Sequence, residues 1–530
     1  MGKDRRPDKV DVIQVTARHL ETYSSAERTL AEMDVPVLYD AANRHNRLFV
    51  ASFDGTGNSR YQDAPENHTN VAEITRQIEH RKDDNVAVGY VEGVGTQRDM
   101  GSRNLDLATG RTFEARLEDM YFQLCDQVKK WKDKDPDAEI RIIANGFSRG
   151  AEQAAAFTRL VHERGIMDPE DARIVIDRDG LRRIASSPRP LLVPPGETAQ
   201  SVLLLDPVAT FAPRKFNRQL PGSVLSGLQP HAIDEGRDQF AGTDYFDVGL
   251  SEGGRFALFR MNGAHSNHGG GYALHGLSRL VGNMGMDFIN AQTANMEPPL
   301  LEKQALPIDP GMYVIHKSEQ HNRTVYTHLY ERFLDRRRTI EELAPRNLCK
   351  QRCDDNDPID QAMRDRFATR RVTIAPASFV DGTEFSWERL KVIVGGRGLQ
   401  AAGEAVDGPA PGASAIDAGD PPPPPSLPLA ETLAARLPEL SDEQLAHVLV
   451  QTREGTGIGT PDQLGTVLRE GDSVFVAGKV PGFHTRVDLA AAPPLQESIA
   501  RIVAIDEAQV VAAADARSRG PGQVPGFALS

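Results

Sequence analysis

The sharpest chemical signal in the chain is Ser148, the central residue of the segment 146–150, which has the pattern Gly-X-Ser-X-Gly. An apolar run over 139–145 predicts a buried strand directly before it, and an alanine-rich stretch over 151–164 predicts a helix directly after it. A serine on a tight turn between a strand and a helix is typical of a nucleophile elbow, which presents the hydroxyl for attack. A purely structural tight turn is the alternative interpretation.

A nucleophilic serine needs a base, and the base needs an acid that orients it. Hydrolases with this elbow carry the three groups in the order serine, acid, histidine, each after a strand. Asp206 closes the apolar run 201–206, and His265 follows the run 255–261, so both fit that order. We therefore expect Ser148 to be the nucleophile, His265 the general base and Asp206 the acid.

The same segments contain competing candidates for two of these roles. Asp206 could instead cap a loop, and Asp244 or Asp247 would then supply the acid. His265 could be a neutral loop histidine, with His268 as the base three residues later. The sequence alone leaves these alternatives open.

An acyl-transfer site also needs backbone N–H groups that stabilise the oxyanion. The first is expected from Arg149, directly after the serine, and the second from Asp54 or Gly55 in the segment FDGTGN, 53–58. Two glycines there allow close approach of the backbone to a ligand. The segment lacks the lysine of a P-loop and the third glycine of a dinucleotide-binding turn, so a phosphate site is a weak interpretation.

A substrate pocket is expected around the same loops. Thr56 and Gly57 belong to the FDGTGN segment, and Glu92 lies in the glycine-rich segment 90–96 after another apolar run. We expect these three residues to line the pocket.

The elements that must hold these residues alternate between two kinds of pattern. One 3.6-residue apolar face extends over 113–131 and predicts a helix. Short apolar runs predict strands at 47–53, 86–91, 139–145, 201–206 and 255–261. Strands that alternate with helices predict an α/β fold with a mostly parallel sheet, flanking helices and a ligand crevice at the carboxyl ends of the strands.

Composition excludes several classes of function. The 530 residues have a net charge of −14, which argues against broad binding of nucleic acid. No run of 18 apolar residues predicts a membrane span. The charged start does not have the pattern of a Sec-type signal peptide, so we expect synthesis in the cytoplasm.

Cys349 and Cys353 would form a disulfide only in an oxidising compartment. We expect no metal, because the acidic segment 354–360 misses the EF-hand spacing, and no cofactor, because a serine triad needs none.

Composition along the chain also predicts domain boundaries. The five consecutive prolines 421–425 lie in an Ala-, Gly- and Pro-rich stretch that predicts a semi-rigid linker. After it, a helix is expected over 429–451 and a hairpin over 466–478, which together indicate a small α+β module. The predicted parts are an N-terminal extension (1–46), a catalytic domain (47–395, with a core at 47–275 and an accessory part at 276–395), the linker (396–428) and the C-terminal module (429–530).

Several motifs in the core region occur in an order that resembles one hydrolase family. They are FDGTGN, NHTNVAEI, VEGVGT, GFSRGA, LLLDPVATF and GAHSNHGGGY, between residues 47 and 275. This region resembles the catalytic region of type VI secretion phospholipase effectors. The resemblance implies an α/β-hydrolase fold and a Ser148–Asp206–His265 esterase of phospholipase A type, which acts on membrane glycerophospholipids. One departure is Asn267, where the family usually has aspartate, followed by His268 in place of an apolar residue.

The C-terminal module carries a second resemblance. Residues 467–502 are similar to the C-terminal recruitment domain of xanthomonad antibacterial type IV secretion effectors. Together the two resemblances imply a secreted antibacterial toxin that acts in the periplasm or envelope of a target cell. They also imply two partners, a cognate immunity protein and a secretion-system coupling ATPase that binds the module. The alternatives are a generic accessory module, an intracellular esterase for a small soluble ester, and a non-catalytic interaction protein on a hydrolase scaffold.

Overall fold

The computed structural model describes most of residues 8–318, 356–395 and 427–505. The gaps inside these ranges are residues 9, 98–102, 104–105, 107–109, 210–212, 214–215, 236, 238–239, 241, 438, 457, 480–483, 495–496, 499–500 and 503–504. Cys349, Cys353 and nearly all of the predicted linker lie outside the described residues. None of the helices in the described ranges is both long and apolar enough to cross a membrane.

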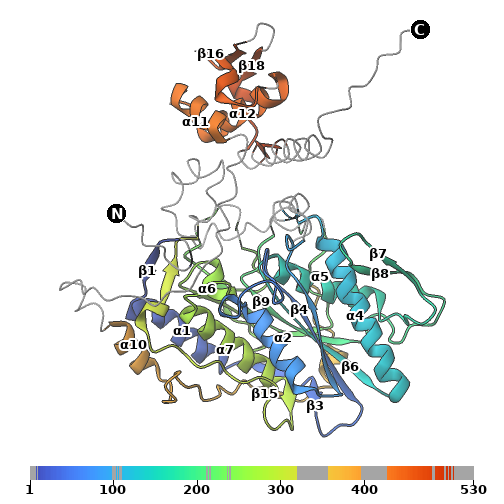
Figure 1. Cartoon of the computed structure of the whole chain (residues 1–530). Coiled ribbons are helices and arrows are strands. Elements are labelled where there is room, and N and C mark those ends of the chain that lie inside the picture. The colour runs from blue at the N-terminus through green and yellow to red at the C-terminus, as the bar shows by residue number, and fades with distance from the viewer. Residues whose placement is uncertain are drawn as a thin grey trace. The chain divides into compact units, whose positions relative to one another are not determined.

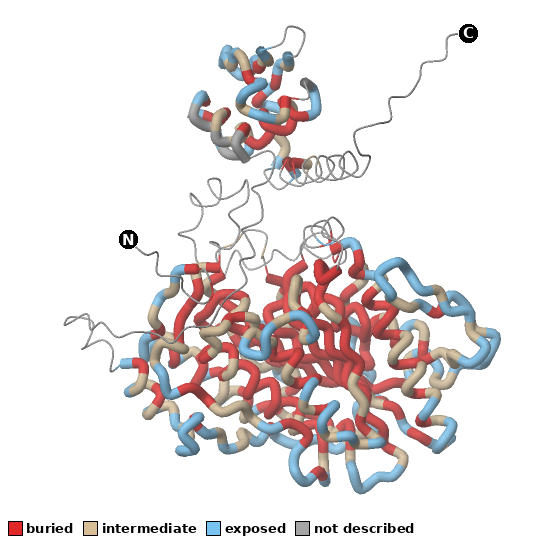
Figure 2. Tube along the Cα trace, in the orientation of Figure 1, coloured by how far each residue is buried: buried red, intermediate tan, exposed pale blue. Residues whose placement is uncertain are grey.

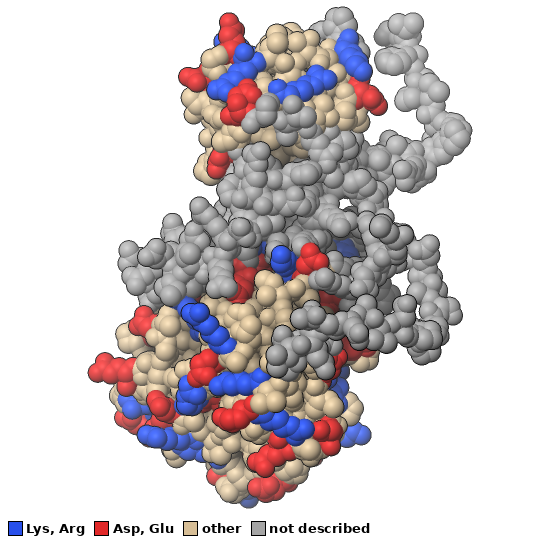
Figure 3. Space-filling model, turned by 90° about the vertical axis from the view of Figure 1, so that its left-hand side faces the viewer, with Lys and Arg blue, Asp and Glu red and all other residues tan. Residues whose placement is uncertain are grey.

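The chain divides into two compact units. The larger comprises Met1–Arg98, Thr109–His321 and Leu334–Asp407, and the smaller comprises Asp99–Ala108, Asn322–Phe333 and Gly408–Ser530. The residues expected to form an N-terminal extension belong to the larger unit. On the face that Figure 3 shows, acidic and basic side chains of the larger unit are interspersed.

A seven-stranded sheet lies at the centre of the larger unit (Figure 1). Its order is β11–β12–β10–β9–β6–β4–β5, and every neighbouring pair is parallel except β11 with β12. The strands are β4 (Asn46–Phe53), β5 (Val86–Val91), β6 (Glu139–Phe147), β9 (Ala199–Leu205), β10 (Val224–Ala232), β11 (Gly249–Leu250) and β12 (Phe256–Met261). This confirms the mixed α/β fold with a mostly parallel sheet.

Helices cover both faces of the sheet, because the strands are apolar on both. In β4, Leu48 and Val50 belong to one buried cluster while Phe49, Ala51 and Phe53 belong to the other. The alternation follows from the two-residue period of a strand. The first cluster includes α1 (Ala17–Leu30), α2 (Asn70–Arg81) and α7 (Gly276–Ala291), and the second includes α4 (Phe113–Lys134) and α5 (Arg149–Arg164).

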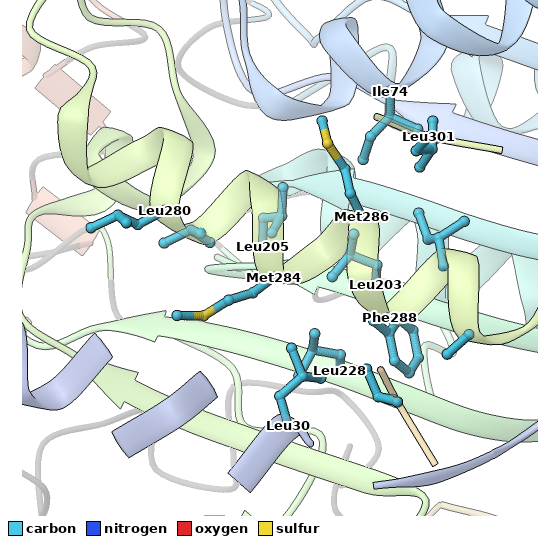
Figure 4. Packing of buried hydrophobic residues seen from close by; sticks show 14 of the residues in the cluster. Leu30, Ile74, Leu203, Leu205, Leu228, Leu280, Met284, Met286, Phe288 and Leu301 are labelled. Atoms are coloured by element: carbon cyan, nitrogen blue, oxygen red, sulfur yellow. The ribbon is translucent and has the colours of Figure 1, made fainter. Parts of the chain in front are cut away.

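The core of the larger unit is continuous from helix to sheet. Figure 2 shows the buried residues concentrated along the central strands. Met284 and Phe288 of α7 pack beside Leu203 of β9 (Figure 4), and all three side chains are at most 2% exposed. Full burial of each such side chain contributes about 1.5–3 kcal/mol to folding. This packing gives the carboxyl ends of the strands a rigid base.

The N-terminal residues pair with segments far away in the sequence. Helix α1 begins at Ala17, and Thr16 caps it by accepting the His19 N–H. Short strand pairs tie this region to the accessory part: β1 (Val12–Gln14) with β14 (Val314–His316), β2 (Asp34–Pro36) with β15 (Thr369–Arg371), and β3 (Tyr39–Asp40) with β13 (Thr293–Ala294). The remaining elements of the larger unit include β7 (Arg173–Ile176), β8 (Arg182–Ser186), α6 (His265–Gly269), α9 (Gln361–Arg364) and α10 (Trp387–Gly395).

The smaller unit is an α+β module. Two helices, α11 (Leu427–Arg436) and α12 (Asp442–Thr456), replace the single helix expected over 429–451. The predicted hairpin is confirmed as β16 (Leu464–Glu470) and β17 (Ser473–Gly478), and β18 (His484–Asp488) adds a third antiparallel strand. Gly471 has a positive φ of 58° in the hairpin turn.

Candidate active site

Ser148 lies on a strained turn between β6 and α5. Its φ of 61° and ψ of −129° are unusual for a residue with a side chain, and its N–H donates to Leu205 O at 3.0 Å. A Cβ on Gly150 would lie 2.4 Å from the carbonyl oxygens of Phe53 and Asp54, so only glycine fits there. The serine is 2% exposed and stands at the amino end of α5, where backbone N–H groups favour negative charge.

Asp206 and His265 meet at the same edge of the sheet. Asp206 follows β9, where Leu205 is in register with Phe147 of β6, and it is fully buried. His265 begins α6 after β12, two strands away, and its Nδ1 lies 2.5 Å from Asp206 Oδ2. The N–H of Ala232 donates to the other carboxylate oxygen at 3.0 Å. A buried carboxylate with these contacts fixes the orientation of the imidazole ring.

Two aromatic rings enclose His265. The ring centroid of Phe147, the residue directly before Ser148, lies 4.5 Å from that of His265, and that of Phe240 lies 4.9 Å away. Burial lowers the pKa of His265 below its usual value, and the contact with Asp206 opposes this shift. The imidazole is therefore neutral at neutral pH, which is the protonation state that a general base requires.

The structure separates the competing candidates from this contact. His268 Nε2 lies 3.5 Å from Tyr23 Oη and 3.4 Å from Asn262 O. Asp244 Oδ2 pairs with Arg260 at 2.8 Å, and Asp247 is exposed. Of the acids and histidines considered, Asp206 and His265 are the two that the structure joins.

Asn267 holds the histidine segment to β14. Its Nδ2 donates to Val314 O at 2.9 Å, and its Oδ1 accepts the N–H groups of Ala264 and His316, each at 3.1 Å. An aspartate has no N–H for Val314 O. The asparagine at this position therefore has a structural reason, because β14 presents a carbonyl oxygen to it.

The loop after β4 lies beside the elbow. Asp54 accepts hydrogen bonds from Tyr90 Oη at 2.6 Å, Thr69 Oγ1 at 2.7 Å and the Gly55 N–H at 2.8 Å. Burial nevertheless raises the pKa of Asp54 to about 6. The Asp54 carboxyl group thus holds the loop together.

The N–H groups of this loop are mostly engaged. Asp54 N–H donates to Val91 O, Gly55 N–H to Asp54 Oδ1, and Gly57 N–H to Val94 O. Of the four N–H groups from residue 54 to residue 57, that of Thr56 is the remaining one. The Arg149 guanidinium donates from Nε to Thr56 Oγ1 at 2.8 Å, which brings the loop and the elbow together.

Glu92 is tied to the loop rather than directed freely into a pocket. Its Oε1 accepts hydrogen bonds from Ser59 Oγ and from Gln62 Nε2, the latter at 3.0 Å. Its backbone carbonyl accepts Arg116 Nη1 at 2.6 Å. In this structure Glu92 fastens neighbouring loops at the edge of the expected pocket.

One group of side chains in the described ranges has the spacing of metal ligands. His45, Asp135 and Asp137 offer ligand atoms within 4.8 Å of one another. They lie at the amino end of β4, whereas Ser148 follows the carboxyl end of β6, and Arg47 already pairs with Asp135 at 3.1 Å. The group is therefore separate from the candidate active site.

Sequence reasoning missed residues that surround His265, among them His231, Glu235 and Phe240. His231 lies in β10, and Glu235 Oε2 accepts the His265 N–H at 3.2 Å. The available signal was the segment 231–238, which contains one histidine and three acidic residues between Asp206 and His265.

A comparison with protein families bears directly on the resemblance. Residues 47–177 match the family model described as "T6SS, Phospholipase effector Tle1-like, catalytic domain". The resemblance to type VI secretion phospholipase effectors is confirmed over this segment, and it supports a hydrolase-type catalytic domain. Ser148 and the loop after β4 lie inside it, whereas Asp206 and His265 lie beyond it.

Solved structures that resemble the chain do so weakly. An uncharacterized protein from Pseudomonas aeruginosa has 16% identity and a TM-score of 0.32, over 52% of this chain and 48% of that one. The Tle1 effector bound to the VgrG spike of the type 6 secretion system has 19% identity and a TM-score of 0.29, over 43% and 52%. A propionate-bound thermophilic esterase from the Planctomycetes species Thermogutta terrifontis has 13% identity and a TM-score of 0.23, over 48% and 87%.

The chain thus spans about half the length of the first two structures, 48% and 52%. None of the curated proteins compared matches the chain.

Proposed function

We propose that the larger unit is an α/β-hydrolase in which Ser148, Asp206 and His265 form a catalytic triad. The observation that carries the proposal is the 2.5 Å contact between His265 Nδ1 and the buried Asp206 carboxylate, together with the positive φ of Ser148, whose neighbour Phe147 packs against the His265 ring. Strained backbone at a serine between a strand and a helix is the geometry of a nucleophile elbow. The triad needs no cofactor.

In the proposed reaction, Ser148 Oγ attacks an acyl carbonyl carbon while His265 Nε2 accepts the hydroxyl proton. The tetrahedral intermediate then expels the alcohol, which takes that proton from His265. Water, deprotonated by His265, attacks the acyl-enzyme, and the fatty acid leaves as His265 returns the proton to Ser148 Oγ. Asp206 holds the ring and stabilises its charged form during both steps.

The oxyanion of this reaction requires two N–H donors. We assign them to Arg149 and, in place of the expected Asp54 or Gly55, to Thr56. The N–H groups of Asp54 and Gly55 are engaged within the described structure, whereas the contact between the Arg149 and Thr56 side chains joins the elbow to the loop that carries the Thr56 N–H. Thr56 and Gly57 would line the adjacent acyl pocket.

The family match supports a membrane phospholipid as the substrate. We infer that the bond cut is an acyl ester of a glycerophospholipid, as in a phospholipase A, because a serine triad acts on acyl carbonyl groups. The family match also supports the role of an effector delivered into target cells, where the lipid envelope is accessible. An immunity protein in the producing cell is the partner that this role predicts, and the resemblance of residues 467–502 to type IV effectors predicts a coupling ATPase bound by the smaller unit. Nucleic acid is not among them, given the net charge of −14.

The decisive experiment compares the wild type with Ser148→Ala on liposomes of mixed-acyl phosphatidylethanolamine and phosphatidylglycerol, analysed by mass spectrometry. We expect lysophospholipid and free fatty acid from the wild type, and a rate about 10⁴- to 10⁶-fold lower from the variant. Ser25→Ala, at an exposed serine of α1, is the matched control and should keep the wild-type rate.

Equal rates from the wild type and Ser148→Ala would overturn the mechanism. Wild-type hydrolysis of short soluble esters with intact liposome lipid would keep the triad but replace the phospholipid by a small ester. The acyl chain released from the mixed-acyl lipid identifies the position that is cut.

A further inference from the structure

A second histidine faces the Asp206 carboxylate from the side opposite His265. His231 is fully buried in β10, and its Nε2 lies 3.7 Å from Asp206 Oδ1. His265 contacts the other oxygen, Oδ2. The Asp206 N–H donates to Pro230 O, which holds the carboxylate over the end of β10. The acid of the proposed triad therefore lies between two imidazole rings.

The other nitrogen of His231 faces a second carboxylate. His231 Nδ1 lies 3.5 Å from Asp244 Oδ1, and Asp244 Oδ2 pairs with Arg260 at 2.8 Å. These distances are long for hydrogen bonds but lie within the range where an opposite charge favours the ionised form. Arg260 is in register with His231 on the neighbouring strand β12.

The two histidines differ in their electrostatic surroundings. His231 has a carboxylate within 3.7 Å of each ring nitrogen, which favours the imidazolium form, and the amide Nε2 of Gln229 also lies 3.5 Å from its Nδ1. The His265 ring lies against one carboxylate, that of Asp206, and the nearby Glu235 is paired with Arg237 at 2.8 Å. Arg260, Asp244, His231 and Asp206 thus form a continuous row of charged and titratable groups.

The burial of Asp206 makes a nearby positive charge important for its ionised form. Asp206 is 0% exposed, and a buried carboxylate is costly without a positive charge or hydrogen-bond donors nearby. His265 must be neutral to act as a base, so it cannot supply that positive charge before the reaction begins. His231 is in position to do so.

We propose that His231 is a positioning residue that stays protonated at neutral pH and balances the charge of Asp206, which keeps His265 neutral and ready to accept a proton. His231 transfers no proton in the reaction. This inference rests on the proposed function of the same site, and it predicts a role for a histidine outside the triad.

The first test is the pH dependence of kcat/KM for His231→Gln. Without the imidazolium, the Asp206 charge acts on His265 alone and favours its protonation, so the acidic limb should move upward by about one pH unit. KM should change little, because His231 does not face the substrate. Asp244→Asn should move the limb in the same direction by less, because His231 loses one of its two carboxylates.

The matched control is His162→Gln, which removes a partly buried histidine whose Nδ1 contacts Ser223 Oγ outside the site. It should leave the acidic limb where it is in the wild type. A folded His231→Gln protein with the wild-type limb would overturn the proposal, since a merely structural histidine would change stability alone.

The second test reads the charge directly in the full-length Ser148→Ala protein. Histidines labelled with ¹³C and ¹⁵N are followed by NMR, and the His231 signal is assigned from its loss in His231→Gln or, if that variant does not fold, from its shift in Asp244→Asn. We expect an imidazolium signal for His231 at pH 7 and a neutral one for His265. A neutral His231 at pH 7 would contradict the proposal even if Ser148 proved dispensable for hydrolysis, so the two failures are distinguishable.

Discussion

At the scale of single residues, Asp54 shows that hydrogen bonding does not fully offset burial. Three donors contact its carboxyl group, yet burial raises its pKa to about 6. Because the pKa in the folded state exceeds that of the unfolded chain, the folded state binds the proton more tightly. This group therefore stabilises the fold at low pH, and that contribution is lost as the pH rises through 6.

Asp54→Asn should remove this pH dependence. From pH 4.5 to pH 7 the wild type should lose about 2 kcal/mol of unfolding free energy through this group, a loss that the uncharged amide avoids. Urea denaturation of both proteins at the two pH values measures how much the unfolding free energy changes with pH in each, and the two changes are then compared. Asp247→Asn, at an exposed carboxylate, is the control, and a pH-independent gap between wild type and Asp54→Asn would contradict the assignment.

Asn267 gives a second prediction at this scale. Asn267→Asp removes the N–H that donates to Val314 O and places a carboxylate in a site that is 1% exposed, which should cost about 1–3 kcal/mol at pH 7. The loss should shrink on acidification, because a protonated carboxyl group can donate to the same oxygen. Urea midpoints at pH 4.5 and pH 7 measure this, and equal losses at both would show that the donor is not the reason for the asparagine.

At the scale of elements, the elbow depends on a close crossing of backbones. A Cβ at Gly150 would lie 2.4 Å from the carbonyl oxygens of Phe53, the last residue of β4, and of Asp54, so α5 has to move away from the sheet in Gly150→Ala. We expect a loss of about 1–3 kcal/mol in stability and of most activity, because Ser148 and the Thr56 loop separate. Gly253→Ala, where an added Cβ meets nothing within 4 Å, is the control for both denaturation and rate.

Apolar runs in the sequence predict a strand when most of its buried residues are apolar, and they do not predict a strand in which other residues interrupt the run. The run 86–91 coincides with β5. No apolar run predicts β10, because Gly227, Gln229 and Pro230 interrupt its apolar residues. Gln229 can be buried there because its amide donates to Thr243 O at 2.7 Å and accepts the Tyr245 N–H. Thr243 and Tyr245 lie 14 and 16 residues further along the chain, so the local sequence around Gln229 does not predict these hydrogen bonds.

The candidate site likewise contains residues that the sequence predicts and features that only the structure reveals. Chain order and strand ends suffice to nominate Ser148, Asp206 and His265, since each follows a strand of the sheet. Which N–H of a loop is engaged depends on neighbours such as Val91 and Val94, so the choice of Thr56 over Gly55 required the structure. The charge of His231 likewise depends on β10 lying between β9 and β12.

At the scale of the whole molecule, the two units provide a test of the predicted linker. Limited proteolysis of the full chain should cut first between residues 396 and 426 and leave two resistant fragments. Mass spectrometry of the fragments locates the cut, and the larger fragment should retain hydrolysis of soluble esters. A first cut near residue 46 would instead show that the N-terminal segment is a separate extension, contrary to the burial of Leu20 and Tyr23.

The pairing of the N-terminal residues with late segments has a consequence for synthesis on the ribosome. Asp8 contacts His316, and the N–H of His316 in turn donates to Asn267 beside His265. The segment around Asp8 therefore leaves the ribosome about three hundred residues before its partners exist. The histidine segment reaches its final support only when residue 316 has emerged, so we expect a nascent chain that already contains Ser148, Asp206 and His265 to be still inactive.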